Sequence, residues 1–178
     1  MDGQATTAMV AAARAGDGGA MDALFRRFAP VVHGVLLGYV QRSDADDLTQ
    51  DVFETVLARL PELRDDAAFP GWVVSIARHA ALDAKRRRAP TVGDAALDVA
   101  AGPGSVEDRL DADHALRAIR GLPEAYRETL LLRLVEGLTG PEIAERTGLT
   151  PGSVRVNLHR GMAMLREAFA GAARGTEP

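Results

Sequence analysis

Apolar side chains recur along this chain at helical spacing, and the alternating pattern typical of strands is nearly absent. A short helix is expected over residues 5–15, ended by Gly16, and Asp17 can cap the helix that follows. That second helix extends over about residues 19–39, and Pro30 is expected to kink or split it. Its predicted core positions are Met21, Leu24, Phe25, Phe28, Val32 and Val35. The fold class that these patterns predict is all-α.

Residues 43–60 predict an amphipathic helix with one apolar and one acidic face. Ser43 and the acidic residues after it are typical of a helix start, where carboxylates favour the helix dipole. The predicted buried face consists of Leu48, Val52, Phe53, Val56 and Leu60. The opposite face carries an acidic strip made of Asp46, Asp47, Gln50, Asp51 and Glu54. This acidic strip is either an ordinary solvated face or a surface that docks on a basic partner.

No metal site is expected in this segment. Asp44 and Asp46 resemble the start of a calcium loop, but the glycine and the closing glutamate of such a loop are missing.

A break at residues 69–71 precedes a long helix that ends in a dense basic run. Its predicted buried stripe consists of Trp72, Val73, Ile76, Ala77 and Ala80. Its basic residues are Arg78, Lys85, Arg86, Arg87 and Arg88. Cations at a helix C-terminus are favoured by the dipole, so helix-end charge is one explanation; the density of the run favours contact with phosphate. Asp83 lies four residues from both His79 and Arg87, which predicts a local ion pair.

Residues 89–105 contain proline and glycine clusters, several acids and no basic residue, a composition typical of a linker. Its length predicts two small helical domains joined by a flexible linker and able to reorient. The expected organisation is an N-terminal domain over residues 1–88, a linker over 89–107 and a C-terminal domain over 108–178.

Residues 139–169 predict two helices joined by a tight turn. Thr139 is expected to cap the first helix and Gly148 to end it, and Thr150 repeats the cap for the second helix. The spacing of a helix-turn-helix is present at Ala144, Gly148 and Val154.

The second helix of this pair has an apolar stripe and a free side. The stripe consists of Val154, Leu158, Met162, Leu165 and Phe169. The free side carries Arg155, Val156, His159 and Arg160. DNA binding is favoured here; the alternative is an ordinary helical hairpin whose arginines are solvated.

Composition narrows the classes of function. The chain has 178 residues, 47% of them hydrophobic and 26% charged, which is an ordinary globular balance. It contains no cysteine, which excludes disulfides, thiolate zinc sites and cysteine nucleophiles. The formal net charge of -4 weakens unaided DNA binding, although local charge decides where phosphate is attracted. The first residues lack a leader pattern and no apolar stretch can span a bilayer, so we expect a cytoplasmic protein without membrane insertion and without a cofactor.

Three stretches of this sequence carry a resemblance to a known family. They are DADDLTQDVF (44–53), GWVVSIARHAALDAKRRR (71–88) and LPEAYRETLLLRLVEGLTGPEIAERTGLTPGSVRVNLHRGMAMLRE (122–167). In this order and spacing the chain resembles a bacterial RNA polymerase sigma factor of the extracytoplasmic-function (ECF) group. With the weaker segment AGDGGAMDALFRRFAPVVHGV, the match covers nearly all of the chain outside the linker.

The resemblance implies a function in transcription initiation. The N-terminal domain would grip the β′ clamp helices of core RNA polymerase and open the minus-ten promoter element, holding the melted non-template strand. The C-terminal domain would bind the minus-thirty-five element as double-stranded DNA and touch the β flap. The linker would thread polymerase channels, and an anti-sigma factor is the expected regulator.

The resemblance also implies roles for the residues singled out above. The acidic strip would contact core polymerase, and Arg78, Lys85, Arg86, Arg87 and Arg88 would meet DNA near the melted segment. The helix that begins at Thr150 would enter the major groove, where Ser153, Arg155 and Val156 are placed for base edges and His159 and Arg160 for bases or backbone. A pocket for an extruded base is expected in the loop over residues 61–69.

Three positions depart from the family pattern. His79 stands where relatives commonly have asparagine, and Asn157 and Gly161 replace a basic residue and an alanine. Gly161 is expected to cost about 1 kcal/mol of helix stability relative to alanine. The promoter sequence is therefore not transferable from relatives.

Two other classes of function compete with this interpretation. An autonomous helix-turn-helix regulator would bind DNA tightly by itself as a symmetric dimer, and it would leave the acidic strip unused. An enzyme that uses the carboxylates of residues 44–51 would need a converging histidine, a phosphate-binding loop or a nucleophile, and the sequence offers none.

Overall fold

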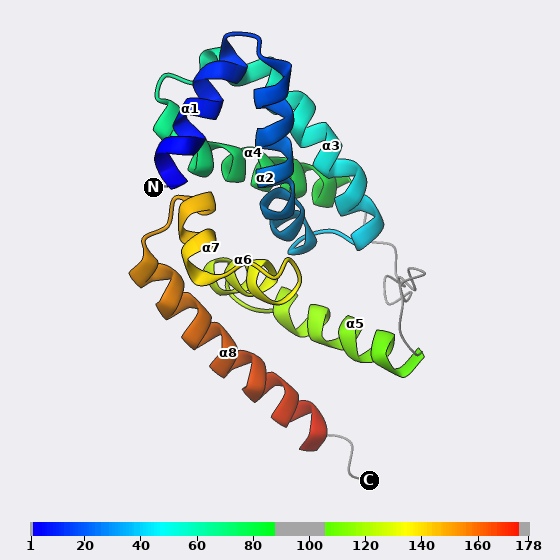
Figure 1. The fold of residues 1–178 in the computed structure, drawn as a ribbon. Helices are drawn as coiled ribbons and strands as arrows, with labels where there is room; N and C mark the ends of the chain where they lie inside the picture. The colour runs from blue at the N-terminus through cyan, green and yellow to red at the C-terminus, as the bar shows by residue number, and fades with distance from the viewer. Residues whose placement is uncertain (1, 88–105, 175–178) are drawn as a thin grey trace.

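The computed structural model describes residues 2–87 and 106–174. Within these ranges every regular element is a helix, so the predicted all-α class is confirmed. Two helical domains, one coloured blue to green and one lime to red, lie on either side of the undescribed segment (Figure 1). The predicted linker over residues 89–107 falls almost entirely outside the described residues. No helix in the described ranges is long and apolar enough to cross a membrane.

The N-terminal domain is built around one central helix, α2. Its elements are α1 (Asp2–Arg14), α2 (Gly18–Leu37), α3 (Arg42–Arg59), the 3-10 turns η1 (Leu60–Glu62) and η2 (Asp66–Ala68), and α4 (Phe69–Arg87). Helix α2 packs against α1, α3 and α4. The rings of Phe28 and Phe69 are 0% exposed and meet edge to face with centroids 5.0 Å apart. Aromatic and aliphatic burial around α2 therefore holds the domain together.

The C-terminal domain places a helix-turn-helix on two supporting helices. Its elements are α5 (Val106–Arg120), α6 (Glu124–Leu134), α7 (Gly140–Thr147) and α8 (Pro151–Arg174). Helix α6 supplies three almost fully buried leucines, Leu130, Leu131 and Leu132. It packs along α8, while α7 packs across both. Helices α5 and α6 therefore form the support on which the helix-turn-helix is mounted.

Two sequence expectations concern where helices begin and end. Of the two alternatives at Pro30, a split is excluded, because α2 continues from Gly18 to Leu37, while a kink stays a prediction. Proline removes one helical hydrogen bond, but flanking residues such as Phe28 and Val31 are fully buried and hold the helix in place. Helix α3 begins at Arg42, with Gln41 as an N-cap that makes no side-chain bond, so Ser43 lies inside the helix rather than capping it.

Several predicted core positions are not fully buried, among them three large aromatic side chains. Phe25 is 39% exposed and packs its ring against Phe53 from the surface, with centroids 4.7 Å apart. Phe169 is 43% exposed near the end of α8, beyond the reach of α6. Trp72 is half-buried and rests against the ring of Phe69. Helical periodicity finds the side of a helix that packs, but not where the packing partner ends.

The two domains lie against each other in this structure. Helix α2 contacts α6 and α7, and α4 contacts α7. A Cβ atom at Gly34 would lie 2.8 Å from Leu132 Cδ2, and one at Gly38 would lie 3.1 Å from Arg127 Nε. The domains therefore approach each other closely at Gly34 in α2 and at Gly38 just after it, where no side chain stands between them. That the domains reorient stays a prediction.

At Gly161, packing against a neighbouring helix opposes helix propensity. This glycine is buried in α8, and a Cβ atom there would lie 3.1 Å from both Cγ and Cδ1 of Leu130. We expect Gly161→Ala to lower the free energy of unfolding by about 1 kcal/mol, because overpacking outweighs the propensity of alanine. Urea unfolding measures the change.

The matched control is Gly152→Ala, in the exposed first turn of α8, where the nearest atom to the new Cβ is Thr150 Oγ1 at 3.9 Å. This control is expected to stabilise the protein. An equal stabilisation at Gly161 would show that Leu130 moves aside freely.

Candidate nucleic-acid and polymerase interfaces

Helix α7 is fixed at both ends by the residues that the sequence predicted. Thr139 Oγ1 accepts a hydrogen bond from the Glu142 backbone N–H at 3.4 Å, and Glu142 Oε2 accepts one from the Thr139 backbone N–H at 2.9 Å. Gly148 follows the helix with φ of 76°, a left-handed conformation that glycine adopts without strain. The capping box and the glycine turn set the direction in which α8 leaves α7.

The start of α8 is capped in the same way. Thr150 Oγ1 accepts a hydrogen bond from the Ser153 backbone N–H at 3.1 Å, and the two hydroxyl oxygens lie 2.8 Å apart. Val154 is 1% exposed and Ala144 is 6% exposed, so the predicted anchor and the small crossing residue are both buried. The predicted helix-turn-helix is confirmed in its local geometry.

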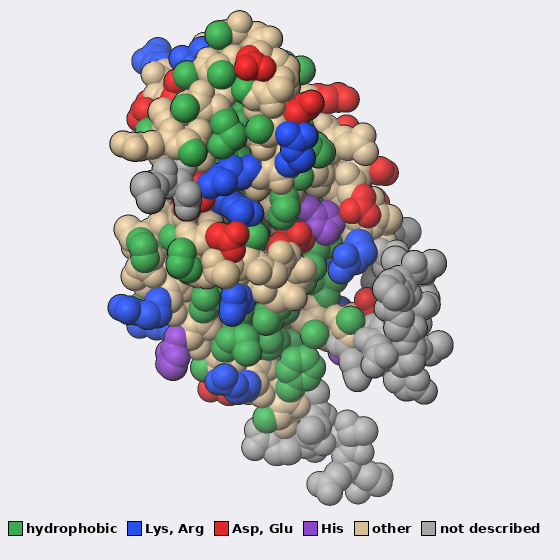
Figure 2. Space-filling model, in the orientation of Figure 1, with side chains coloured by type: hydrophobic (Ala, Val, Ile, Leu, Met, Phe, Trp, Pro, Cys, Tyr) green, Lys and Arg blue, Asp and Glu red, His purple; other side chains and the backbone are tan. Residues whose placement is uncertain are grey.

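The outer side of α8 is free of the rest of the protein. Arg155, His159 and Arg160 are exposed, and Val156 is 42% exposed. Figure 2 shows basic and histidine side chains spaced along the region of α8. Asn157 instead turns towards α6, where its Nδ2 donates to Thr129 Oγ1 at 3.4 Å. The departure from the family pattern at Asn157 therefore faces the supporting helix.

The acidic strip forms the solvent side of α3. Its members Asp46, Asp47, Gln50, Asp51 and Glu54 are all exposed. Val52 and Val56 on the other side are at most 1% exposed. Acidic side chains gather over the edge that α3 forms in Figure 2. Among the described contacts of the strip, Asp46 reaches another helix: its Oδ1 lies 3.2 Å from His33 Nε2 on α2.

The basic run closes α4 with exposed cations. Lys85, Arg86 and Arg87 occupy the last turn. Arg86 pairs with Asp83 one turn earlier, so Asp83 does form the predicted local ion pair, but with Arg86 rather than with His79 or Arg87. Arg88, the last member of the predicted run, lies outside the described residues.

Arg78 is set apart from the other cations of α4. Its Nε and Nη2 donate to Oε1 and Oε2 of Glu128 on α6, at 2.8 and 2.7 Å, and Nε lies 3.6 Å from Glu124 Oε1. The bond to Glu128 raises the pKa of Arg78 above its ordinary value. In this arrangement Arg78 is held by the C-terminal domain, and its contact with promoter DNA stays a prediction.

A groove of about 640 Å³ runs between α3 and α4, and sequence reasoning did not identify it. Trp72 and His79 line it on α4, Asp51 lines it on α3, and Arg87 stands at its basic end. His79 is held by its Nδ1–H, which donates to the Ser75 carbonyl at 2.7 Å. The loop over residues 61–69, where a base pocket is predicted, contains most of η1, all of η2 and the first residue of α4, with Leu63 and Phe69 buried; that it holds an extruded base stays a prediction.

Two known family models match this chain, one on each domain. The family described as Sigma-70 region 2 matches residues 24–91, and Sigma-70, region 4, matches residues 114–165. The chain is 35% identical over 158 residues to RNA polymerase sigma factor CarQ of Myxococcus xanthus, which covers 84% of this chain and 90% of CarQ. This chain is an ECF RNA polymerase sigma factor by family.

Further comparisons agree with this family. The sigma factor is 33% identical over 185 residues to the ECF RNA polymerase sigma factor SigD of Mycobacterium tuberculosis, across 97% of this chain and 87% of SigD. Its fold is similar to that of CnrH in the structure of CnrH with the cytosolic domain of CnrY, with a TM-score of 0.63 and 22% identity. That likeness covers 94% of this chain and 98% of CnrH.

The family match assigns the surfaces to two regions of the sigma factor. The acidic strip, the groove and the described part of the basic run fall within region 2. The exposed side of α8 falls within region 4. Helix α1 precedes both matches, and its Thr6 Oγ1 donates to Glu145 Oε1 on α7 at 3.1 Å.

Loss of the capping box should weaken the sigma factor in a pH-dependent way. We expect Thr139→Ala to lower the free energy of unfolding by about 1 kcal/mol at pH 7, because the Glu142 backbone N–H loses its acceptor and the Glu142 carboxylate loses the hydroxyl donor, keeping only the Thr139 backbone N–H. Hydrogen bonds to the Thr139 backbone and hydroxyl lower the pKa of Glu142 from 4.5. A lowered carboxyl pKa stabilises the folded state above pH 4.5, and that stability is lost as the pH falls through the folded-state pKa.

The difference between wild type and Thr139→Ala should therefore shrink in acid, which urea unfolding at a series of pH values measures. Thr7→Ala is the control, because the Thr7 hydroxyl donates to a helical carbonyl, Gly3 O, and involves no carboxylate. A deficit that stays constant down to pH 3 would contradict the role of Glu142.

Proposed function

We propose that this sigma factor binds core RNA polymerase and directs promoter-specific transcription initiation, including melting of the promoter. It is a dissociable specificity subunit without chemistry of its own, acting in the cytoplasm. The observation that carries the proposal is the separation of charge on one chain of this family: an exposed acidic strip on α3 and an exposed cationic side of α8. An anionic surface for protein and a cationic surface for DNA fit a factor that brings polymerase to a promoter.

The acidic strip docks on the β′ clamp helices of core polymerase. Its carboxylates are exposed and, apart from Asp46, are not engaged by another helix in any described contact. Exposed charges of one sign steer a protein to a surface of opposite sign and fix its orientation there. We therefore interpret the acidic strip as a docking surface rather than as an ordinary solvated helix face.

Region 2 opens the minus-ten element. The exposed cations Lys85, Arg86 and Arg87, continued by Arg88, attract the DNA backbone. The groove between α3 and α4 then receives bases of the melted non-template strand, with Trp72 and His79 as planar side chains against which a base can stack. Binding of an extruded base offsets the unstacking cost of a few kcal/mol.

Region 4 binds the minus-thirty-five element with α8 in the major groove. Thr150 and Ser153 stand at its start, Arg155 and Val156 are placed for base edges, and His159 lies one turn further. Arg160 extends the same side towards bases or backbone. Leu134 and Val135, 50% and 37% exposed at the end of α6, offer an apolar contact for the β flap.

An anti-sigma factor is the proposed regulator, because a protein that covers the acidic strip or α8 would prevent the contacts just described. Such a factor is expected to bind the sigma factor in place of core polymerase.

The proposed function is tested by run-off transcription on genomic fragments, with core polymerase alone, with the sigma factor alone and with both. Specific initiation that requires both components is the expected result. Tight, dimeric and polymerase-independent binding to a promoter would instead identify an autonomous regulator.

Neutralising the acidic strip should weaken assembly with core polymerase. We expect Asp47→Asn combined with Asp51→Asn to weaken binding by about tenfold or more, because close charge pairs across an interface couple by about 1.5 kcal/mol or more. Titration of fluorescent sigma factor with core polymerase measures the affinity. The control, Asp22→Asn with Glu62→Gln, removes two exposed charges elsewhere in the N-terminal domain. If both double variants bound core polymerase with equal affinity, the acidic strip would not be part of the interface.

Removing Arg155 should relax promoter selection. We expect Arg155→Ala to cost about 1 to 3 kcal/mol on the preferred minus-thirty-five sequence, if its guanidinium binds a guanine through two hydrogen bonds. Initiation by the holoenzyme from promoters with a randomised minus-thirty-five element measures the selection. Arg166→Ala, an exposed arginine three turns along α8, is the control. Unchanged selection by Arg155→Ala would show that this residue does not contact bases.

A further inference from the structure

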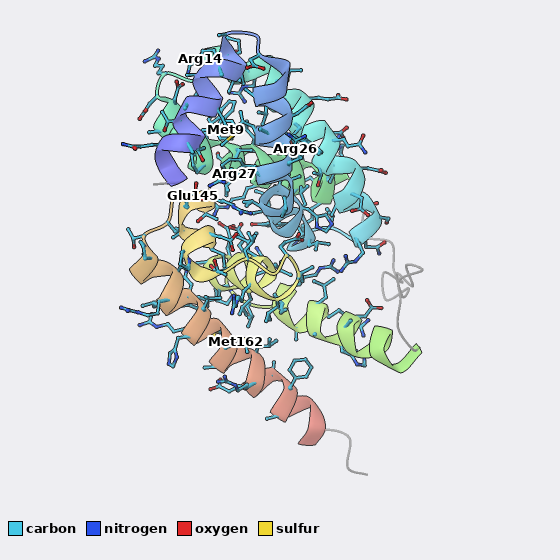
Figure 3. The ribbon with its side chains drawn as sticks, in the orientation of Figure 1. Met9, Arg14, Arg26, Arg27, Glu145 and Met162 are labelled. Carbon is cyan, nitrogen blue, oxygen red and sulfur yellow. The ribbon has the colours of Figure 1, made fainter. Side chains whose placement is uncertain are left out.

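The groove between α3 and α4 lies within the N-terminal domain, away from the contact between the two domains. Figure 3 shows Arg27 of α2 and Glu145 of α7 facing each other where the domains meet, and Arg27 Nη2 donates to both carboxylate oxygens of Glu145 at 2.6 Å. Neither residue lines the groove, and all of the residues that line it belong to α3 or α4. A ligand in the groove is therefore recognised by side chains of these two helices.

His79 presents a hydrogen-bond acceptor of fixed position on the α4 wall. Its Nδ1 lies 2.7 Å from the Ser75 carbonyl oxygen. A carbonyl oxygen can only accept, so Nδ1 carries the hydrogen, and in the neutral ring Nε2 carries none. The His79 side chain is exposed and lines the groove, and none of the described contacts engages its Nε2. Nε2 is therefore available to accept a hydrogen bond from a ligand.

The α3 wall offers acceptors as well. The Thr55 hydroxyl donates to the Asp51 backbone carbonyl at 3.0 Å, so only the lone pairs of its oxygen remain for another partner. The Asp51 carboxylate is exposed and can only accept. The Ser75 hydroxyl can donate or accept. Acceptors therefore prevail among the polar groups of the two walls.

The other polar side chains of the groove suit other parts of a nucleotide. Arg59 Nε is bound to Glu62 at 3.3 Å. Arg87, in the last turn of α4, is placed for backbone phosphate. The Trp72 ring offers its face for stacking. A base stacked in the groove therefore turns its edge towards groups that mainly accept.

The four bases differ in what they bring to such a site. Adenine carries an exocyclic amino group at N6 and cytosine carries one at N4, whereas guanine and thymine carry keto oxygens at the corresponding positions. An amino group donates to Nε2 of His79. A keto oxygen in the same place would leave two acceptors facing each other, and both would lose their bonds to water. The groove therefore favours an amino group on the base edge that meets His79.

We infer that His79 selects adenine or cytosine in the melted non-template strand, by accepting a hydrogen bond at Nε2 from the exocyclic amino group of the base. The inference rests on the proposed function and names the class of base that the groove takes. Asparagine, the residue of the family pattern at this position, carries both a donor and an acceptor and pairs with either kind of base. His79 therefore makes promoter selection narrower than asparagine would.

The test uses a partly melted minus-ten DNA without a minus-thirty-five element, bound by the sigma factor together with core polymerase at pH 8. At each unpaired position in turn, adenine is compared with purine and cytosine with 2-pyrimidinone, which lack only the amino group. For wild type we expect one position at which this loss weakens binding by about fivefold or more. His79→Phe keeps a flat ring without the acceptor, so the same loss should change its binding by less than about twofold.

Two further variants separate base selection from effects on folding. His79→Asn should bind amino-bearing and keto-bearing bases with similar affinity at the sensitive position, because its amide can donate and accept. His114→Phe changes an exposed histidine of α5, outside the proposed surfaces, and should behave like wild type. Circular dichroism melting confirms that each variant is folded. Long-range proton–nitrogen NMR spectra of the isolated sigma factor report which nitrogen of His79 carries the hydrogen.

Equal dependence on the amino group in wild type and His79→Phe would overturn the inference. So would a neutral His79 ring with its hydrogen on Nε2. If wild type with core polymerase binds the melted DNA but distinguishes no base from its analogue, base selection by His79 is rejected and the proposed function stands. If wild type with core polymerase binds none of the melted probes, the proposed function itself is rejected, and the inference with it.

Discussion

The burial of α2 on several sides is the constraint on which this structure depends. Helices α1, α3 and α4 pack against it within its own domain, and α6 and α7 pack against it from the other. A helix in that position has little polar surface, which is why Val31, Val32, Val35, Leu36 and Leu37 are all 0% exposed. Apolar burial is therefore centred on α2, and each helix around it is positioned by the apolar side chains of α2 that it covers.

Helices α3 and α4 bury their apolar faces on α2, and α8 buries its own on α6, so the outward faces of all three can carry charge. The acidic strip on α3 and the cations of α8 belong to different domains. Region 2 nevertheless carries both signs, with acids on α3 and cations at the end of α4 on either side of the groove. A protein-binding and a DNA-binding surface can thus coexist on a chain whose net charge is -4.

Local chemistry was predictable from the sequence, and contacts between distant segments were not. Thr139, Gly148 and Thr150 act through bonds to residues within four positions of themselves, so their caps could be read directly from sequence order. The acidic strip and the free side of α8 followed from helical period alone.

Most of what the sequence left out depends on a partner far away in sequence. Ser43 is the exception, because it has the chemistry of a cap and the error is local: α3 already begins at Arg42. At Gly161, helix propensity leaves out the Leu130 side chain, which the fold brings within 3.1 Å of a Cβ atom there. Arg78 lies on the outer face of α4, which is where the sequence predicts a cation that contacts DNA. Only the fold brings Glu128, 50 residues later, to its guanidinium. The groove between α3 and α4 likewise needs both helices in place before it exists.

The missing side chain at Gly34 has a consequence for the distance between the two domains. A larger residue there meets Leu132 and Glu136 of the other domain. Such a change therefore acts on the fit between the two domains, at a place where neither contributes a polar contact from α2. A single absent methyl group thus sets how closely the two domains can approach each other.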